Sequence, residues 1–231
     1  MNSPEEFLRI HESVATLAAG DFHRTAALAT ITRTQGSTFR RAGARMLVHA
    51  DGEIVCALSG GCPQRDIVVR ALQAIEQDRP ALARYNRDSS LDVLMEMGCG
   101  GELDVLIEPL RNLQDVGFLR AMARTRAAGF AATVFARNGE VFAPRPQRLV
   151  KVGDSVWNDV ADSLLAEHIV AEIARRNDHA ALDLQRLQGS DAVFDVLIEG
   201  LRPAHALILV GLNPASLALA RQATALGWTT R

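Results

Sequence analysis

Short apolar segments typical of strands alternate with amphipathic helical segments along most of this 231-residue chain. Residues 25–34 are rich in Ala, Ile and Thr and residues 103–110 in Leu, Val and Ile, whereas residues 63–77 place apolar side chains on one helical face. Ser3, Pro4 and Glu6 form a capping box before a first helix that ends at Gly20. The alternation predicts an α/β fold in which a mixed sheet is covered by helices.

Two hairpin turns and a short linker divide the rest of the chain into predicted elements. Asp-Gly at 51–52 and Asn-Gly at 138–139 predict hairpins, and helices are expected at 115–128 and 158–175. Residues 200–205 resemble a linker, and residues 206–226 follow a strand, turn and helix pattern, as a Rossmann domain begins. We therefore expect one domain over residues 1–200 and a partial Rossmann-like unit over residues 201–231.

Two predicted strands share the same four residues. Residues 105–108 and residues 196–199 both read Val-Leu-Ile-Glu. One four-residue similarity between strands is weak evidence for a duplication, so we interpret it as the shared chemistry of buried strands.

Composition excludes several classes of protein. Lys and Arg total 25 against 27 Asp and Glu, and aromatic residues make up 5%, so the charge pattern of a nucleic-acid binder is missing. The first six residues are acidic and no apolar run approaches the roughly 20 residues that span a bilayer, so we expect a cytoplasmic chain without a membrane segment. Three cysteines and six scattered histidines predict neither a disulfide framework nor a metal site built by the protein alone.

The turn at residues 59–63 is the first motif that could bind a ligand. It reads Ser-Gly-Gly-Cys-Pro between a strand and a helix, so its glycines allow close backbone approach and its free amides suit an anion. The helix dipole would also lower the pKa of Cys62 toward a reactive thiolate. The alternative is a tight turn with a small buried cysteine.

Two further polar loops accompany this turn. Residues 98–101 read Gly-Cys-Gly-Gly directly before a strand, and residues 35–41 offer hydroxyl and guanidinium groups that can grip an oxyanion. Neither cysteine loop contains a Cys-x-x-Cys pair, so two thiols facing one soft metal or a sulfur-bearing ligand fit better than zinc. For residues 35–41 the alternative is a polar surface turn.

Three segments in this order resemble the XdhC/CoxI family: GSTFRRAGARMLV, LSGGC and MGCGGELDVLIEPL. That family comprises accessory proteins for molybdenum hydroxylases such as xanthine dehydrogenase and carbon monoxide dehydrogenase. The resemblance implies that the chain binds and protects molybdenum cofactor, supports its sulfuration and delivers it to the apo-enzyme. It also assigns the cofactor or its sulfur to Cys62 and Cys99, which would meet the metal only through the cofactor's molybdenum.

The remaining expected cofactor-binding residues belong to the same loops. They are Ser59, Gly60, Gly61, Gly100, Gly101, Ser37, Thr38 and Arg40. The chain departs from the family pattern at Cys56, where glycine is usual, at Phe39, where proline is frequent, and at Pro63-Gln64, which replaces an apolar residue and Glu. The last change leaves a family-type acidic role beside Cys62 unsupported.

The glycine turn at residues 211–216 departs from a dinucleotide-binding turn. Asn213 replaces the glycine that allows close approach of a pyrophosphate, and no acidic residue for a ribose follows before Arg231. We therefore expect no tight NAD(P) binding by this chain. A lone strand and helix leave an apolar face to be covered, so we also expect a homodimer.

The hypothesis favoured by the sequence is a cofactor chaperone without catalytic residues, rather than an enzyme. Its expected partners are a molybdenum hydroxylase apo-enzyme and a cysteine desulfurase. The first alternative is an enzyme, either a nucleotide-dependent oxidoreductase or a sulfur-transfer catalyst that uses Cys62. The second is a partner subunit that has lost cofactor binding.

Overall fold

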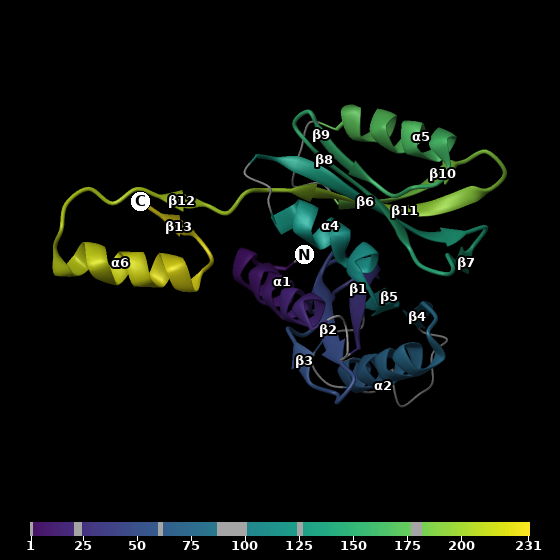
Figure 1. The fold of residues 1–231 in the computed structure, drawn as a ribbon, viewed down its shortest axis with the longest axis horizontal. Coiled ribbons are helices and arrows are strands. Elements are labelled where there is room, and N and C mark those ends of the chain that lie inside the picture. Colours follow the sequence, from purple (N-terminus) through teal and green to yellow (C-terminus); the bar gives the residue numbers. More distant parts are fainter. Residues whose placement is uncertain (1, 21–24, 60–61, 87–100, 124–126, 177–181) are drawn as a thin grey trace.

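The computed structural model describes residues 2–20, 25–59, 62–86, 101–123, 127–176 and 182–231. Within them the chain forms two large antiparallel sheets and a small C-terminal unit (Figure 1). One helix covers the outer face of each sheet, and two helices lie between the sheets. The α/β class and the covering helices are thus confirmed, but two antiparallel sheets replace the single mixed sheet that we expected.

The first sheet has the strand order β3-β2-β1-β5-β4. Its strands are β1 (Ala26–Gln35), β2 (Arg45–His49), β3 (Ile54–Val55), β4 (Ala81–Tyr85) and β5 (Glu102–Leu110). Its helices are α1 (Pro4–Ala19) on the inner face and α2 (Cys62–Gln77) on the outer face. The first seven residues of the central strand β1 are buried, because helices cover both faces of the sheet.

The second sheet has the strand order β10-β11-β6-β8-β9, with β7 paired to β6. Its strands are β6 (Gly129–Arg137), β7 (Glu140–Val141), β8 (Gln147–Val152), β9 (Ser155–Asn158), β10 (Leu182–Gln188) and β11 (Val193–Leu201). Its helices are α4 (Leu113–Ala123) on the inner face and α5 (Ser163–Ala174) on the outer face.

The capping box expected at the first helix is present. Ser3 Oγ accepts the Glu6 amide at 3.2 Å, and the Glu6 carboxylate accepts the Ser3 amide at 2.8 Å. Ile10, Val14 and Leu17 then bury one face of α1 in a cluster that also contains side chains of α4 and of both sheets. The inner helices therefore join the two sheets through one apolar core.

Some predicted boundaries were wrong. Residues 155–158 form a strand, so the helix expected from residue 158 begins at Ser163, where Asp162 caps it by accepting the Leu165 amide. The helix expected over residues 115–128 is α4, which ends at Ala123. Strands β4 and β10 were missed, and so was the short strand Thr229–Thr230, so the C-terminal part contains two strands and not the lone strand that we expected.

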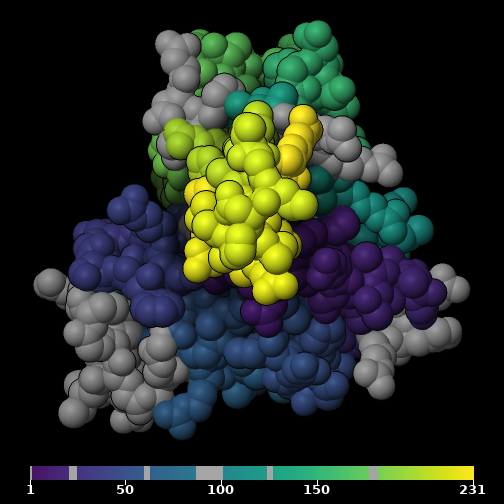
Figure 2. All heavy atoms as spheres, turned by 90° about the vertical axis from the view of Figure 1, so that its left-hand side faces the viewer, coloured from purple at the N-terminus to yellow at the C-terminus, as the bar shows by residue number. Residues whose placement is uncertain are grey.

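The C-terminal unit consists of β12 (Ala206–Leu207), α6 (Pro214–Ala225) and β13 (Thr229–Thr230), with the two short strands parallel. It projects from the sheets (Figure 1), and in the end-on view it stands in front of them, with the N-terminal helix visible beside it (Figure 2). A Cβ at Gly227 would lie 2.6 Å from the Glu5 amide nitrogen, so the unit touches the start of α1. Among the described helices, none is both long and apolar enough to cross a membrane.

Candidate functional site

The ends of three strands meet at one edge of the first sheet. Gln35, the last residue of β1, pairs with Glu102, the first residue of β5. Tyr85, the last residue of β4, pairs with the next residue along β5, Leu103. The strand ends that flank the loop after β1 and the loop between β4 and β5 therefore lie side by side. The first of these loops contains the polar motif at residues 35–41, and the second contains the Gly-Cys-Gly-Gly motif at residues 98–101.

Gly101 brings the loop before β5 against the loop after β1. A Cβ at this position would lie 2.6 Å from the carbonyl carbon of Ser37 and 2.7 Å from Cγ2 of Thr38, and it would clash with the Ser37 carbonyl oxygen. Because backbone atoms form most of this contact, a side chain cannot be accommodated by a simple rotation. The predicted residues Gly101, Ser37 and Thr38 are therefore brought together.

The turn before α2 is held by a side chain of that helix. The Gln64 side-chain carbonyl accepts the amides of Leu58 and Ser59, each at 3.1 Å. Its Nε2 lies 2.7 Å from the sulfur of Met46 on β2. The residue that departs from the family's glutamate thus fixes the backbone that enters the predicted anion-binding turn.

A second contact fixes the first turns of α2 beside the end of β4. The Tyr85 hydroxyl donates to Oδ2 of Asp66 at 2.7 Å, and Arg70 Nε donates to the same oxygen at 2.6 Å. Burial and the hydrogen bond to Asp66 raise the pKa of Tyr85, so the phenol stays protonated and remains a donor. Tyr85 ends β4 at the edge of the sheet where the two loops begin, and Asp66 lies one helical turn after Cys62. The contact between Tyr85 and Asp66 therefore places the start of α2 at the same edge.

The predicted Arg40 is committed to an ion pair. Its Nη2 lies 2.5 Å from the Glu6 carboxylate on α1, and Thr38 Oγ1 donates to the Arg40 carbonyl at 2.9 Å. Partial burial would raise the pKa of Glu6, but the hydrogen bonds from Arg40 and the Ser3 amide, together with the charge of Arg40, lower that pKa. Arg40 therefore ties the loop after β1 to the N-terminal helix.

Four predicted residues, Gly60, Gly61, Cys99 and Gly100, lie outside the described residues. For Cys62 the structure places the backbone at the start of α2. Among the described residues there is no group of three or more His, Cys, Asp or Glu side chains that could hold a metal ion. What the site offers chemically is the N-terminus of a 16-residue helix, which favours an anion, beside loops rich in hydroxyl and amide groups.

Sequence reasoning missed the residues that hold these loops. Gln64, Asp66 and Tyr85 position the turn and the helix end, and none was among the predicted site residues. The spacing of Cys62, Asp66 and Arg70 at i, i+4 and i+8 along one helix was an available signal for Asp66, whereas no local pattern indicated Gln64 or Tyr85.

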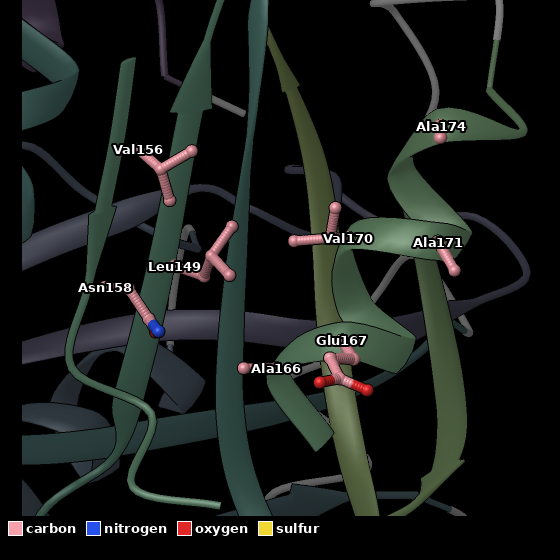
Figure 3. A pocket seen from close by; sticks show the side chains of 8 residues that line it. All are labelled: Leu149, Val156, Asn158, Ala166, Glu167, Val170, Ala171 and Ala174. Atoms are coloured by element: carbon pink, nitrogen blue, oxygen red, sulfur yellow. The ribbon is translucent and has the colours of Figure 1, made fainter. Parts of the chain in front are cut away.

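A groove of about 410 Å³ lies elsewhere, between α5 and strands β8 and β9 (Figure 3). Leu149, Val156 and Val170 give it an apolar lining, and Asn158 and Glu167 are its polar side chains. It belongs to the second sheet and shares no residue with the three loops. It is therefore distinct from the candidate site.

Comparison with known proteins places the resemblance in the first half of the chain. Residues 21–86 match the model of the XdhC and CoxI family, so the resemblance inferred from the sequence is confirmed over this segment. A probable xanthine dehydrogenase subunit of Bacillus subtilis is 39% identical over 75 residues, which are 32% of this chain and 23% of that protein. A "Molybdenum cofactor insertion chaperone PaoD" of Escherichia coli is 31% identical over 90 residues, which are 38% of this chain and 28% of that protein.

The fold is similar to that of a solved structure. The crystal structure of a xanthine dehydrogenase from Bacillus halodurans matches 99% of this chain with a TM-score of 0.68 and 23% sequence identity. The chain covers 61% of that structure and no more than 28% of the two curated relatives. At this identity the structural similarity supports the fold and not a shared activity.

Proposed function

We propose that this chain is an accessory protein that holds molybdenum cofactor and delivers it to a molybdenum hydroxylase. The observation that carries the proposal is the contact of Gly101 with the loop after β1, at the edge of the first sheet where Tyr85 also holds the first turns of α2. The loops contain parts of the segments on which the family resemblance rests, and strands β2 and β5 contain the other parts. The match to the XdhC and CoxI family and the name of the Escherichia coli relative support the same role.

The donor groups of these loops suit that cofactor. Molybdopterin carries an anionic phosphate, which suits the N-terminus of α2, and a metal that suits thiolate sulfur. In this proposal Cys62 and Cys99 meet the molybdenum or its sulfur, and Ser37, Thr38 and Ser59 offer hydroxyl groups. Arg40 acts by positioning its loop, since its guanidinium is paired with Glu6.

Further parts of the proposal concern partners and location. We propose a cytoplasmic protein that supports sulfuration of the cofactor together with a cysteine desulfurase.

We also propose a homodimer, because the C-terminal unit exposes Val210 and Leu212 almost fully and Ile208 for the larger part. Weak NAD(P) binding belongs to the same proposal, since Asn213 caps α6 and accepts the Ser216 amide at 2.9 Å, which leaves that amide unavailable to a pyrophosphate.

Anaerobic binding to the purified chain tests the proposal, with molybdenum and pterin measured together. We expect the wild type to bind both, and Cys62→Ser and Cys99→Ser each to weaken binding at least tenfold, because a hydroxyl is a poor ligand for a soft metal. Cys56→Ser is the matched control. The Cys56 thiol donates to the Glu6 carbonyl at 3.5 Å, and burial raises its pKa, so we expect its loss to leave binding unchanged.

The enzyme alternative predicts a different outcome. A sulfur-transfer enzyme that uses Cys62 would turn over substrate without any molybdoenzyme, and an oxidoreductase would retain NAD(P) stoichiometrically. Either result, or a folded wild type that binds neither molybdenum nor pterin, would contradict the chaperone role.

A further inference from the structure

The two sheets repeat one arrangement of elements. Apart from the additional short strand β7 in the second half, each half has an inner helix, three strands, an outer helix and two more strands, and the five main strands take the same order. Thus β1, β2, β3, β4 and β5 occupy the places that β6, β8, β9, β10 and β11 occupy in the second sheet. In Figure 1 the outer helices α2 and α5 lie on opposite sides of the molecule, and the inner helices α1 and α4 lie together at its centre.

The repeat extends to individual residues. Thr30 of β1 pairs with Arg45 of β2, and Thr133 of β6 pairs with Arg148 of β8. Each of these arginines donates from Nη1 to the carbonyl two residues before it, at 3.2 Å for Arg45 and 3.3 Å for Arg148. Similar backbones alone do not require the same buried side chain and the same local hydrogen bond at equivalent places.

The glutamates that end the two Val-Leu-Ile-Glu segments are equivalent as well. Leu28 of β1 faces Glu108 of β5, two residues before Thr30. Ala131 of β6 faces Glu199 of β11, two residues before Thr133. The four-residue similarity that we interpreted as strand chemistry therefore falls at matching positions of two matching sheets.

The arginines and glutamates pair across the two sheets and not within them. Arg45 of the first sheet pairs with Glu199 of the second, and Arg148 of the second pairs with Glu108 of the first. All four side chains are buried, with at most 3% of each exposed. In a symmetric dimer, residue i of one protomer contacts residue j of the other while j contacts i. The two ion pairs have this reciprocal pattern.

We propose that residues 4–110 and 113–201 are two copies of one structural unit, joined through an isologous interface whose centre is these two reciprocal ion pairs. The second copy takes the place that a second protomer would take in a homodimer. Phe118 of α4 lies at this centre, with its ring centroid 4.1 Å from Cζ of Arg148 and 5.9 Å from Cζ of Arg45.

The second copy has kept the interface and lost the contacts that hold the candidate site. Counted back from the two equivalent glutamates, Ala192 occupies the place of Gly101. Leu187, which pairs with Phe194, occupies the place of Tyr85, which pairs with Leu103. A chain of two units therefore has one candidate site, a conclusion that rests on the proposed function.

Double-mutant cycles in the full chain, followed by urea unfolding, test the interface. We expect Arg45→Met, Glu199→Met, Arg148→Met and Glu108→Met each to lower the folding equilibrium constant by about a hundredfold or more, because each leaves one buried charge unpaired. The matched doubles, Arg45→Met with Glu199→Met and Arg148→Met with Glu108→Met, should each recover most of the loss. The crossed double, Arg45→Met with Glu108→Met, leaves two charges without their partners, so it should recover far less than the matched doubles and keep most of the summed loss of the two single variants.

A crossed double that recovers as much as the matched ones would overturn the inference, as would recovery in only one matched double. If the methionine variants do not fold, Glu108→Gln and Glu199→Gln keep the side-chain shape and replace them. Their losses in the folding equilibrium constant should agree within about tenfold, and a larger difference would contradict equivalent pairs.

Molybdenum and pterin bound per chain test the single site separately. One of each per chain is expected, and two of each would contradict a single site. Absence of binding would overturn the proposed function and the single site with it, while the cycles would still decide the interface.

Discussion

Replacing Phe118 by alanine is expected to lower the free energy of unfolding by about 3–5 kcal/mol, the usual cost of removing a buried phenylalanine from a core. The side chain is 1% exposed and lies in the apolar cluster that joins both sheets through α1 and α4. It also covers the guanidinium groups of Arg45 and Arg148. Its removal therefore leaves a cavity beside four buried charges, and urea unfolding measures the loss.

Phe39→Ala is the matched control for this prediction. The Phe39 side chain is 68% exposed in the loop after β1, so its loss should change the free energy of unfolding by no more than about 0.5 kcal/mol. Equal losses for Phe118→Ala and Phe39→Ala would show that the contact between the two sheets does not depend on this apolar core.

Gly101→Ala should lower both stability and cofactor binding. The added Cβ meets the Ser37 backbone, so the two loops must separate, at a cost of about 1–3 kcal/mol, as for other overpacked sites. Because these loops contain predicted ligand groups, we expect at least about tenfold weaker binding of molybdenum and pterin, as measured by equilibrium dialysis under anaerobic conditions.

Gly20→Ala provides the comparison. Gly20 ends α1 with φ −95°, and a Cβ there would meet backbone oxygens no closer than 3.7 Å. Stability and binding should therefore be nearly unchanged in this variant. If Gly101→Ala bound cofactor like Gly20→Ala, the contact between the loops would have no part in the site.

Most elements could be predicted from local pattern, and the errors have physical causes. Apolar strands such as β1 and β5, and helices with a capping signal such as α1, were located to within one or two residues. Strand β4 was missed because it is short and contains the charged Arg84, and its pairing with β5 is a tertiary contact. Strand β10 shows the alternation of a half-buried strand in Leu-Asp-Leu-Gln-Arg-Leu-Gln, so its signal was present and went unused.

The candidate site was predictable as a set of loops and not as an arrangement. Glycine density and the position of Cys62 before a helix indicated ligand-binding turns, but which loops meet depends on strand register, as in the pairing of Gln35 with Glu102. Arg40 was predicted as an anion ligand because its partner Glu6 is 34 residues away and invisible to a local pattern. The proposed repeat of the two sheets could not be predicted either. It is seen in the order of the strands, whereas the sequence similarity between the two halves is little more than four residues.

Transfer of cofactor to a molybdenum hydroxylase is the central claim, and reconstitution of an apo-enzyme tests it most directly. The purified chain is loaded anaerobically with molybdenum cofactor, freed of unbound cofactor and mixed with a cofactor-free molybdenum hydroxylase. Activity and bound molybdenum are then followed together. We predict that both appear in the hydroxylase as molybdenum leaves this chain, and that a Cys62→Ser chain treated in the same way transfers little. A loaded wild-type chain that keeps its molybdenum, or that transfers no more than the Cys62→Ser chain, would contradict the proposed role.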